Sequence, residues 1–146
     1  MTHDDRHPRL GCGAAIVRDG QLLLIQRLRP PEAGCWSLPG GKVDWLETLA
    51  DAVTREVHEE LGVVIHAPSL LCIADQIDGG TPEHWAAVCY LVTRFDGEPV
   101  LREPHKHAAF GWFALTDLPE PLTVSARLAG RTLLERRRAG QPSDGT

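Results

Sequence analysis

The stretch LPGGKVDWLETLADAVTREVHEELGV, residues 38–63, places two adjacent glycines shortly before a run that contains neither proline nor glycine. That run, about residues 48–61, predicts a helix that stops at Gly62, because glycine commonly follows the last helical residue. At 100° per residue, one arc of apolar side chains is expected to face a core: Leu46, Ala50, Val53, Val57 and Leu61. The stretch therefore predicts an amphipathic helix after a sharp glycine turn.

A second arc of the same helix carries three glutamates, Glu56, Glu59 and Glu60. Like charges at i, i+3 and i+4 cost only a few tenths of a kcal/mol each, so a solvated acidic face is the alternative to a cation site. The glycines at 40 and 41 let bare backbone approach a ligand. Mg²⁺ is typically held by carboxylates while it shares phosphate oxygens of a substrate. The combination of acidic helix and glycine turn favours a magnesium site.

The flanking sequence predicts a single mixed α/β domain over residues 9–139, with flexible tails at 1–8 and 140–146. Asp19-Gly20 joins two apolar runs and predicts a tight hairpin. Extended segments are expected at 36–38, 63–77, 85–95 and 108–115, and a second helix at about 123–138. We find no internal repeat and no linker.

Composition limits the classes of function. The chain has 146 residues, a net charge of -5 and a pI of about 5.8, which disfavours stable binding to nucleic acid or to an anionic membrane. No apolar run approaches the ~20 residues of a membrane span, and the polar start has no signal-peptide core. The four cysteines form no C-x-x-C pair and are expected to be reduced, mostly buried thiols. A cytoplasmic protein is predicted.

Gly41, Glu47 and the segment REVHEELGV, residues 55–63, match every fixed position of the Nudix box, and the chain resembles the Nudix hydrolase family. Weaker similarity extends to WSLPGG before the box and to WFALTDLP after it. The resemblance implies the Nudix fold, a mixed β-sheet sandwiched between helices. MutT-type nucleoside triphosphate pyrophosphatases are the most similar branch.

Roles for the box residues follow from this resemblance. In similar proteins, glutamates at the positions of Glu56, Glu59 and Glu60 bind Mg²⁺ or Mn²⁺, and the carbonyl of the glycine matching Gly40 adds a ligand. Glu56 or Glu59 is the candidate base that activates water. Arg55 is placed with these catalytic residues, and Glu47 is expected to support it, so that the pair orients the glutamates. An ordinary surface ion pair, worth ~0–1 kcal/mol, is the alternative.

Residues outside the box complete the predicted site. Glu103, which precedes the last strand, is expected to add a metal ligand, with Glu98 and Glu83 as alternatives. Arg27 and Arg29, together with Gly41, are candidates for substrate contact.

The remaining candidate side chains are expected to have ordinary structural roles. Histidines in loops are mostly surface residues, so the surface role is favoured for His105 and His107. Trp36 is expected to pack against the box loop. Four other aromatic residues could stack on a base but are expected to lie mostly in the core, with Phe110 and Trp112 on one buried face: Trp85, Tyr90, Phe110 and Trp112.

The leading hypothesis is hydrolysis of a nucleoside diphosphate linked to a group X, most simply a normal or modified (d)NTP cleaved to NMP and pyrophosphate. The first alternative is an ADP-ribose or nucleotide-sugar pyrophosphatase. Similar enzymes often carry a proline at some distance past the box, and the position of Pro82 neither supports nor excludes this alternative. The second is a nucleotide-sensing module without turnover. The expected partner is a small nucleotide, and monomer and homodimer both remain open.

Overall fold

The computed structural model describes residues 7–77 and 83–141. In chain order the elements are β1 (Arg9–Arg18), β2 (Gln21–Arg27), β3 (Trp36–Ser37), β4 (Gly40–Lys42), α1 (Leu49–Leu61), β5 (Val64–His66), β6 (Ser69–Ile77), β7 (His84–Val92), β8 (Arg94–Asp96), β9 (His107–Ala114) and α2 (Val124–Arg138). Most of both predicted tails, and Pro82, lie outside the described residues.

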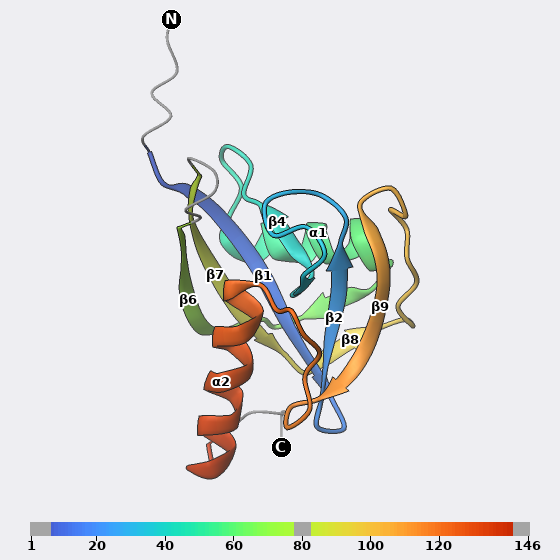
Figure 1. Cartoon of the computed structure of the whole chain (residues 1–146), viewed down its shortest axis with the longest axis vertical. Helices are drawn as coiled ribbons and strands as arrows, with labels where there is room; N and C mark the ends of the chain where they lie inside the picture. Colours follow the sequence, from blue (N-terminus) through green and yellow to red (C-terminus); the bar gives the residue numbers. More distant parts are fainter. Residues whose placement is uncertain (1–6, 78–82, 142–146) are drawn as a thin grey trace, which may run out of the picture.

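The main sheet is mixed, as the sequence predicts, and β1 lies at its centre (Figure 1). Its strands follow the order β3-β2-β1-β7-β6, while β4 adds to β1 and β9 adds to β2. β1 and β7 are parallel, with Arg9 opposite Trp85 and Ile16 opposite Val92. The other pairs are antiparallel, and β5 and β8 form a separate two-stranded sheet.

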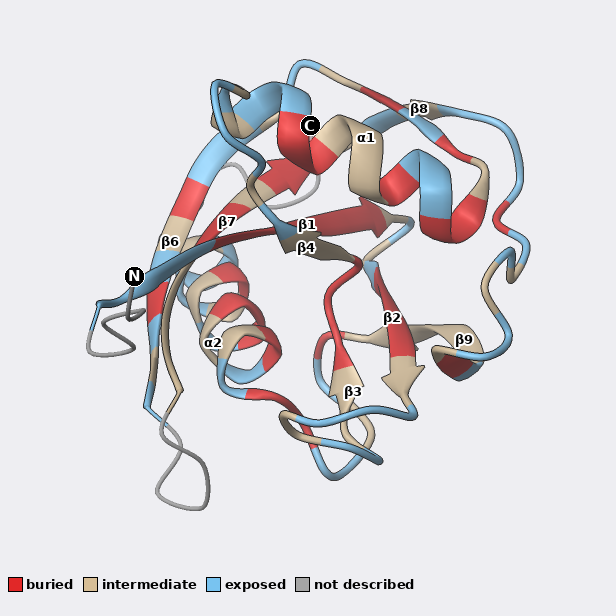
Figure 2. Ribbon diagram, turned by 90° about the horizontal axis from the view of Figure 1, so that it is seen from above, coloured by how far each residue is buried: buried red, intermediate tan, exposed pale blue. Residues whose placement is uncertain are grey.

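The sheet is buried on both faces because α1 covers one side and α2 the other (Figure 2). In β2, Leu22 and Leu24 belong to the core beneath α2, whereas Leu23 and Ile25 belong to the core beneath α1. A strand that is covered on both faces has a continuous run of apolar residues in its sequence rather than an alternation of apolar and polar ones. This explains the LLLI segment and confirms the predicted sandwich of a mixed sheet between helices.

Both predicted helices are confirmed, and each begins after a threonine that caps it. The side chain of Thr48 accepts a hydrogen bond from the Asp51 N–H, and α1 ends at Gly62 with φ of 72°. Leu46 contradicts the predicted apolar arc, since its side chain is 87% exposed. It precedes the cap, so the helical spacing does not apply to it. Ala50 is likewise exposed, and Ala52 is buried instead.

The two longest predicted strands are each interrupted. Residues 63–77 split into β5 and β6 at Ala67, whose φ is 48°, and residues 85–95 split into β7 and β8. The predicted hairpin is confirmed: Asp19 and Gly20 both have positive φ, as a type I′ turn requires. In the described parts of the chain, no helix combines the length and apolar character that crossing a membrane demands. The cytoplasmic location stays a prediction.

Candidate functional site

Glu60 is the most deeply buried acidic side chain of the α1 cluster, with 3% of its surface exposed. It lies beside Val57 and Leu61 on the stripe of α1 that packs on the sheet, so its carboxylate points inward rather than into solvent. Its Oε1 accepts a hydrogen bond of 3.0 Å from the Gly40 N–H. Burial raises the pKa of Glu60 well above its usual value, and the negative charge of Glu56 raises it further.

Gly40 and Gly41 belong to a strand rather than to the turn predicted from the sequence. They form β4, with Gly40 opposite Gly13 and Gly41 opposite Cys12 on β1. The carboxylate of Glu56 packs directly on Gly41, where a Cβ atom would lie 2.7 Å from its carboxyl carbon. Burial raises the pKa of Glu56. The absence of a side chain at 41 therefore makes room for a half-buried glutamate.

Replacing Gly41 by alanine is expected to displace the Glu56 carboxylate and to lower kcat by about tenfold or more, as changes beside metal ligands do. The free energy of unfolding should change little, because the new methyl group meets the end of a flexible side chain. Steady-state kinetics and urea unfolding test this. Gly140→Ala, with no atom within 4 Å of the added Cβ, is the control for the kinetics, while its φ of 71° should cost about 1 kcal/mol of stability. Unchanged kinetics in Gly41→Ala would contradict the packing argument.

Arg55 connects the acidic helix to the loop before it. Its Nε and one terminal nitrogen donate to the two carboxylate oxygens of Glu47 at 2.7 and 2.9 Å, and the same terminal nitrogen donates to the Lys42 carbonyl at 3.2 Å. Its other terminal nitrogen lies 3.0 Å from Glu56 Oε1 and 3.3 Å from Glu59 Oε2. The hydrogen bonds from Arg55 to Glu47 lower the pKa of Glu47 to about 2. One guanidinium thus touches three of the acidic side chains predicted for the site.

Glu103 comes close to α1 because the chain before it follows the end of that helix. The Arg102 N–H donates to the Glu60 carbonyl at 3.1 Å. The Glu103 charge contributes to the raised pKa of Glu60, and its carboxylate pairs with Lys106 at 3.2 Å. The alternatives are paired away from α1: Glu98 pairs with Arg18 at the surface, and Glu83 pairs with Arg9 and borders the cavity beside β4.

The sequence favours a surface position in a loop for His107, and this prediction is wrong. It begins β9 and is only 7% exposed, and its Nε2 lies 3.3 Å from Glu60 Oε2. Burial lowers the pKa of His107. His105 is exposed, as expected. A buried histidine beside a buried glutamate is therefore part of the site.

The donors present suit a hard divalent cation, although they are not gathered into a finished cage. Over residues 7–77 and 83–141, no three Asp, Glu, His or Cys side chains are placed to hold a metal ion together. Glu60 Oε2 is nonetheless buried and has no well-aligned hydrogen bond within the described residues, although the neighbouring Glu56 carboxyl group interacts with the Glu60 side chain. A buried carboxylate oxygen without a donor is costly unless a cation or another partner reaches it. Glutamate oxygens are the ligands that Mg²⁺ and Mn²⁺ favour.

A cavity of about 370 Å³ adjoins β4 on the α2 side of the sheet. Its floor consists of small residues, Gly11 and Gly13 on β1 and Ala87 on β7, so the sheet is left uncovered there. The Trp85 ring borders this floor, about 3.4 Å from where a Cβ at Gly11 would lie. Gly40 and Gly41 form the wall between the cavity and the glutamates of α1. The volume suits a flat ring system of a small ligand.

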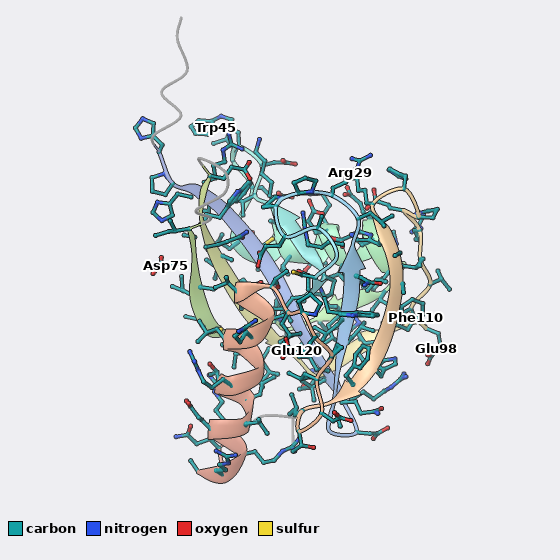
Figure 3. All side chains as sticks on the ribbon, viewed as in Figure 1. Arg29, Trp45, Asp75, Glu98, Phe110 and Glu120 are labelled. Carbon is teal, nitrogen blue, oxygen red and sulfur yellow. The ribbon has the colours of Figure 1, made fainter. Side chains whose placement is uncertain are left out.

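The two arginines predicted to contact substrate differ in position. Arg27 lines the cavity, where its Nε donates to the Pro31 carbonyl at 2.8 Å. Arg29 is exposed, does not line the cavity and stands on the outside of its loop in Figure 3. Arg27 is therefore the better placed of the two.

The expectation that most aromatic candidates lie in the core is wrong, since all five are only partly buried and four of them pack against the edge of a core cluster: Trp36, Tyr90, Phe110 and Trp112. Trp36 packs edge-on against Phe113 at 5.0 Å, and Trp112 stacks with Phe95 at 6.0 Å. Phe110 and Trp112 share the α1 side of the sheet, where both are partly buried. Of the five candidates, Trp85 alone lines the cavity.

Comparison with known proteins gives one consistent family. The family model of the NUDIX domain matches residues 7–133. A crystal structure of a MutT NUDIX hydrolase from Burkholderia pseudomallei superposes with a TM-score of 0.85 at 58% identity, covering 87% of this chain and 98% of that one.

Two curated relatives are also similar in sequence. An ADP-ribose pyrophosphatase of Methanocaldococcus jannaschii is 34% identical over 114 residues, which cover 78% of this chain and 66% of the relative. A putative 8-oxo-dGTP diphosphatase 2 of Mycobacterium tuberculosis is 38% identical over 107 residues, covering 71% and 72%. The segment matched by the family model contains α1, β4 and every described residue that lines the cavity.

Proposed function

The chain belongs to the Nudix hydrolase family, whose members act on nucleoside diphosphate derivatives, and from this premise we propose that it cleaves a normal or modified (d)NTP to NMP and pyrophosphate with a divalent cation. The observation that carries the proposal is the arrangement around β4. The acidic side chains of α1 lie on one side of Gly40 and Gly41, and the cavity lies on the other. A nucleotide whose base enters the cavity would bring its phosphates to the glutamates.

The cation would be held by Glu56, Glu59 and Glu60, with the Gly40 carbonyl and Glu103 as further ligands. When bound, Mg²⁺ or Mn²⁺ offsets the charge of the phosphates and lowers the pKa of a coordinated water. Arg55 contacts one oxygen of Glu56 and both oxygens of Glu59. Glu56 Oε2 would therefore be left for the cation, whereas Glu59 would have to turn away from Arg55.

The protein supplies the base and the orientation of the acidic groups. Glu56 is favoured over Glu59 as proton acceptor, because burial raises its pKa and a carboxylate with a raised pKa is a stronger base. Arg55, fixed by Glu47, orients Glu56 and Glu59 through one terminal nitrogen. Arg27 and Gly41 line the cavity and are the proposed substrate contacts. Arg29 would contact the substrate only if its phosphates extend beyond the cavity.

The ADP-ribose alternative is favoured by one specific observation, the relative of 34% identity that bears this activity in its name. ADP-ribose contains a diphosphate with an adenosine on one side, so it would use the same cavity and the same acidic helix. The two readings differ in the bond cleaved and in the products.

A substrate panel distinguishes these readings. We expect NTPs or modified NTPs with Mg²⁺ to yield NMP and pyrophosphate, EDTA to abolish turnover, and added Mg²⁺ to restore it. Products are separated by ion-exchange chromatography, and hydrolysis in H₂¹⁸O shows which phosphorus is attacked.

Each contrary result has a definite meaning. Turnover of ADP-ribose alone, to AMP and ribose 5-phosphate, would replace the proposed reaction with the first alternative. Binding of nucleotides without turnover of any panel member, with and without Mg²⁺ or Mn²⁺, would favour a sensing module.

A further inference from the structure

Backbone hydrogen bonds hold His107, the first residue of β9, in place. Its N–H donates to the Glu103 carbonyl at 3.1 Å, and the Leu28 N–H donates to the Lys106 carbonyl at 2.9 Å. His107 lies opposite Arg27 at the end of the β2–β9 pair. The imidazole therefore projects from a backbone that is fixed on both sides.

This imidazole faces the one oxygen of Glu60 that the backbone leaves free. Oε1 accepts the Gly40 N–H, whereas Oε2 lies 3.3 Å from His107 Nε2. The ring N–H is not aligned well enough with Oε2 to form a hydrogen bond, and Oε2 and His107 Nδ1 both have no hydrogen-bond partner among the described residues. A small rotation of the carboxylate would bring Oε2 onto the Nε2–H.

Each of these neighbouring side chains thus keeps one buried polar atom without a hydrogen bond, Glu60 Oε2 and His107 Nδ1. Such atoms are expensive in a folded protein and call for a functional reason. An apolar side chain at 107 would pack against the same neighbours without this cost. A donor at 107 becomes useful when Glu60 is ionised beside a cation, because the carboxylate must then keep one orientation.

We propose that His107 is a positioning residue for Glu60, whose Nε2–H fixes the Oε2 side of the carboxylate while the Gly40 N–H fixes the Oε1 side. The inference rests on the proposed function, in which Glu60 is a cation ligand. His107 itself touches neither substrate nor cation.

Three variants of the full chain test the role. Glutamine at 107 places an N–H close to the position of Nε2, whereas leucine fills similar space without a donor. His107→Leu is expected to weaken Mn²⁺ binding about 10–100-fold, measured by titration calorimetry, and to lower kcat more than it changes KM. His107→Gln should stay within about threefold of the parent, and His105→Leu, at the exposed neighbouring histidine, should match the parent.

A readout without metal shows whether the carboxylate has moved. Both variants remove the ring current of the imidazole, so the Gly40 amide signal in an NMR spectrum of the metal-free protein should move in both. It should move further in His107→Leu than in His107→Gln, since this amide donates to Glu60. Melting temperatures should lie within about 5 °C of the parent, so that misfolding does not explain the loss.

Several results would overturn the proposal. Parent-like Mn²⁺ affinity and kcat in His107→Leu, with a Gly40 signal that moves no further than in His107→Gln, would make His107 a packing residue. Equal losses in the leucine and glutamine variants would show that the donor is not what matters. If the parent neither binds Mn²⁺ nor hydrolyses nucleotides, the proposed function fails first and this inference falls with it.

Discussion

Glu60→Gln should lower kcat about 10²–10³-fold with any nucleotide that the parent hydrolyses, the size of effect seen when one charge-stabilising group is removed from an active site. Glutamine keeps the acceptor for the Gly40 N–H and nearly the same volume, so the packing of α1 on the sheet is preserved. What it removes is the negative charge in a buried position beside β4. Steady-state kinetics over a range of Mg²⁺ concentrations measure the loss.

The same variant should also change how the free energy of unfolding depends on pH. An acid whose pKa is raised on folding favours the folded state below its unfolded pKa, about 4.5, and this contribution is lost as pH rises through the higher folded pKa. The metal-free parent should therefore lose stability above about pH 4.5 relative to Glu60→Gln, which has no carboxyl group to ionise there. Urea unfolding at several pH values tests this.

Glu135→Gln, on the exposed face of α2, is the matched control for both measurements. It should have parent-like kinetics and a parent-like pH dependence. Parent-like turnover in Glu60→Gln would remove Glu60 from the site and leave the proposed reaction without its central residue.

Gly40→Ala should lower the free energy of unfolding by roughly 2–4 kcal/mol, because it forces one backbone segment into another. A Cβ at this position would collide with the Cys12 carbonyl and lie 2.7 Å from Gly13 Cα, and neither atom belongs to a flexible side chain. Relief requires β4 to move away from β1, which would also displace the N–H that holds Glu60. Stability and activity should fall together.

Gly34→Ala is the matched control for Gly40→Ala. Gly34 has φ of 85° and no atom within 4 Å of an added Cβ, so this variant should lose only about 1 kcal/mol from backbone strain. Urea unfolding curves of the two variants measure the difference. Equal losses would show that the close approach of β4 and β1 has no special importance.

The box helix could be predicted from the sequence almost to the residue, because its limits depend on local chemistry. Thr48 caps one end and Gly62 closes the other. The short strand at Gly40–Lys42 could not, since its pairing with β1 joins residues that are far apart in the chain and depends on Gly13 lying opposite Gly40. The local breaker signal of Pro39-Gly40-Gly41 corresponds only to a bend at Pro39, and it does not indicate the pairing partner of the two glycines.

His107 escaped prediction for a related reason. Strict alternation along β9 from Phe110 would put His107 on the opposite face of the sheet. The pairing with β2 shifts between Gln26 and Arg27, so that Ala109 faces Gln26 while His107 faces Arg27. An irregularity of one residue thus places an imidazole beside Glu60, and no signal in the sequence of β9 alone indicates it.

The parallel pairing at the centre of the sheet has a consequence for how the chain is made. Arg9 pairs with Trp85, 76 positions later, so β1 keeps one edge without a partner until β7 has left the ribosome. Contacts at such separation slow folding, and unpaired apolar strands are prone to aggregate meanwhile. The nascent chain should therefore gain protease resistance only after β7 emerges, which makes the first two strands the natural clients of a chaperone during synthesis.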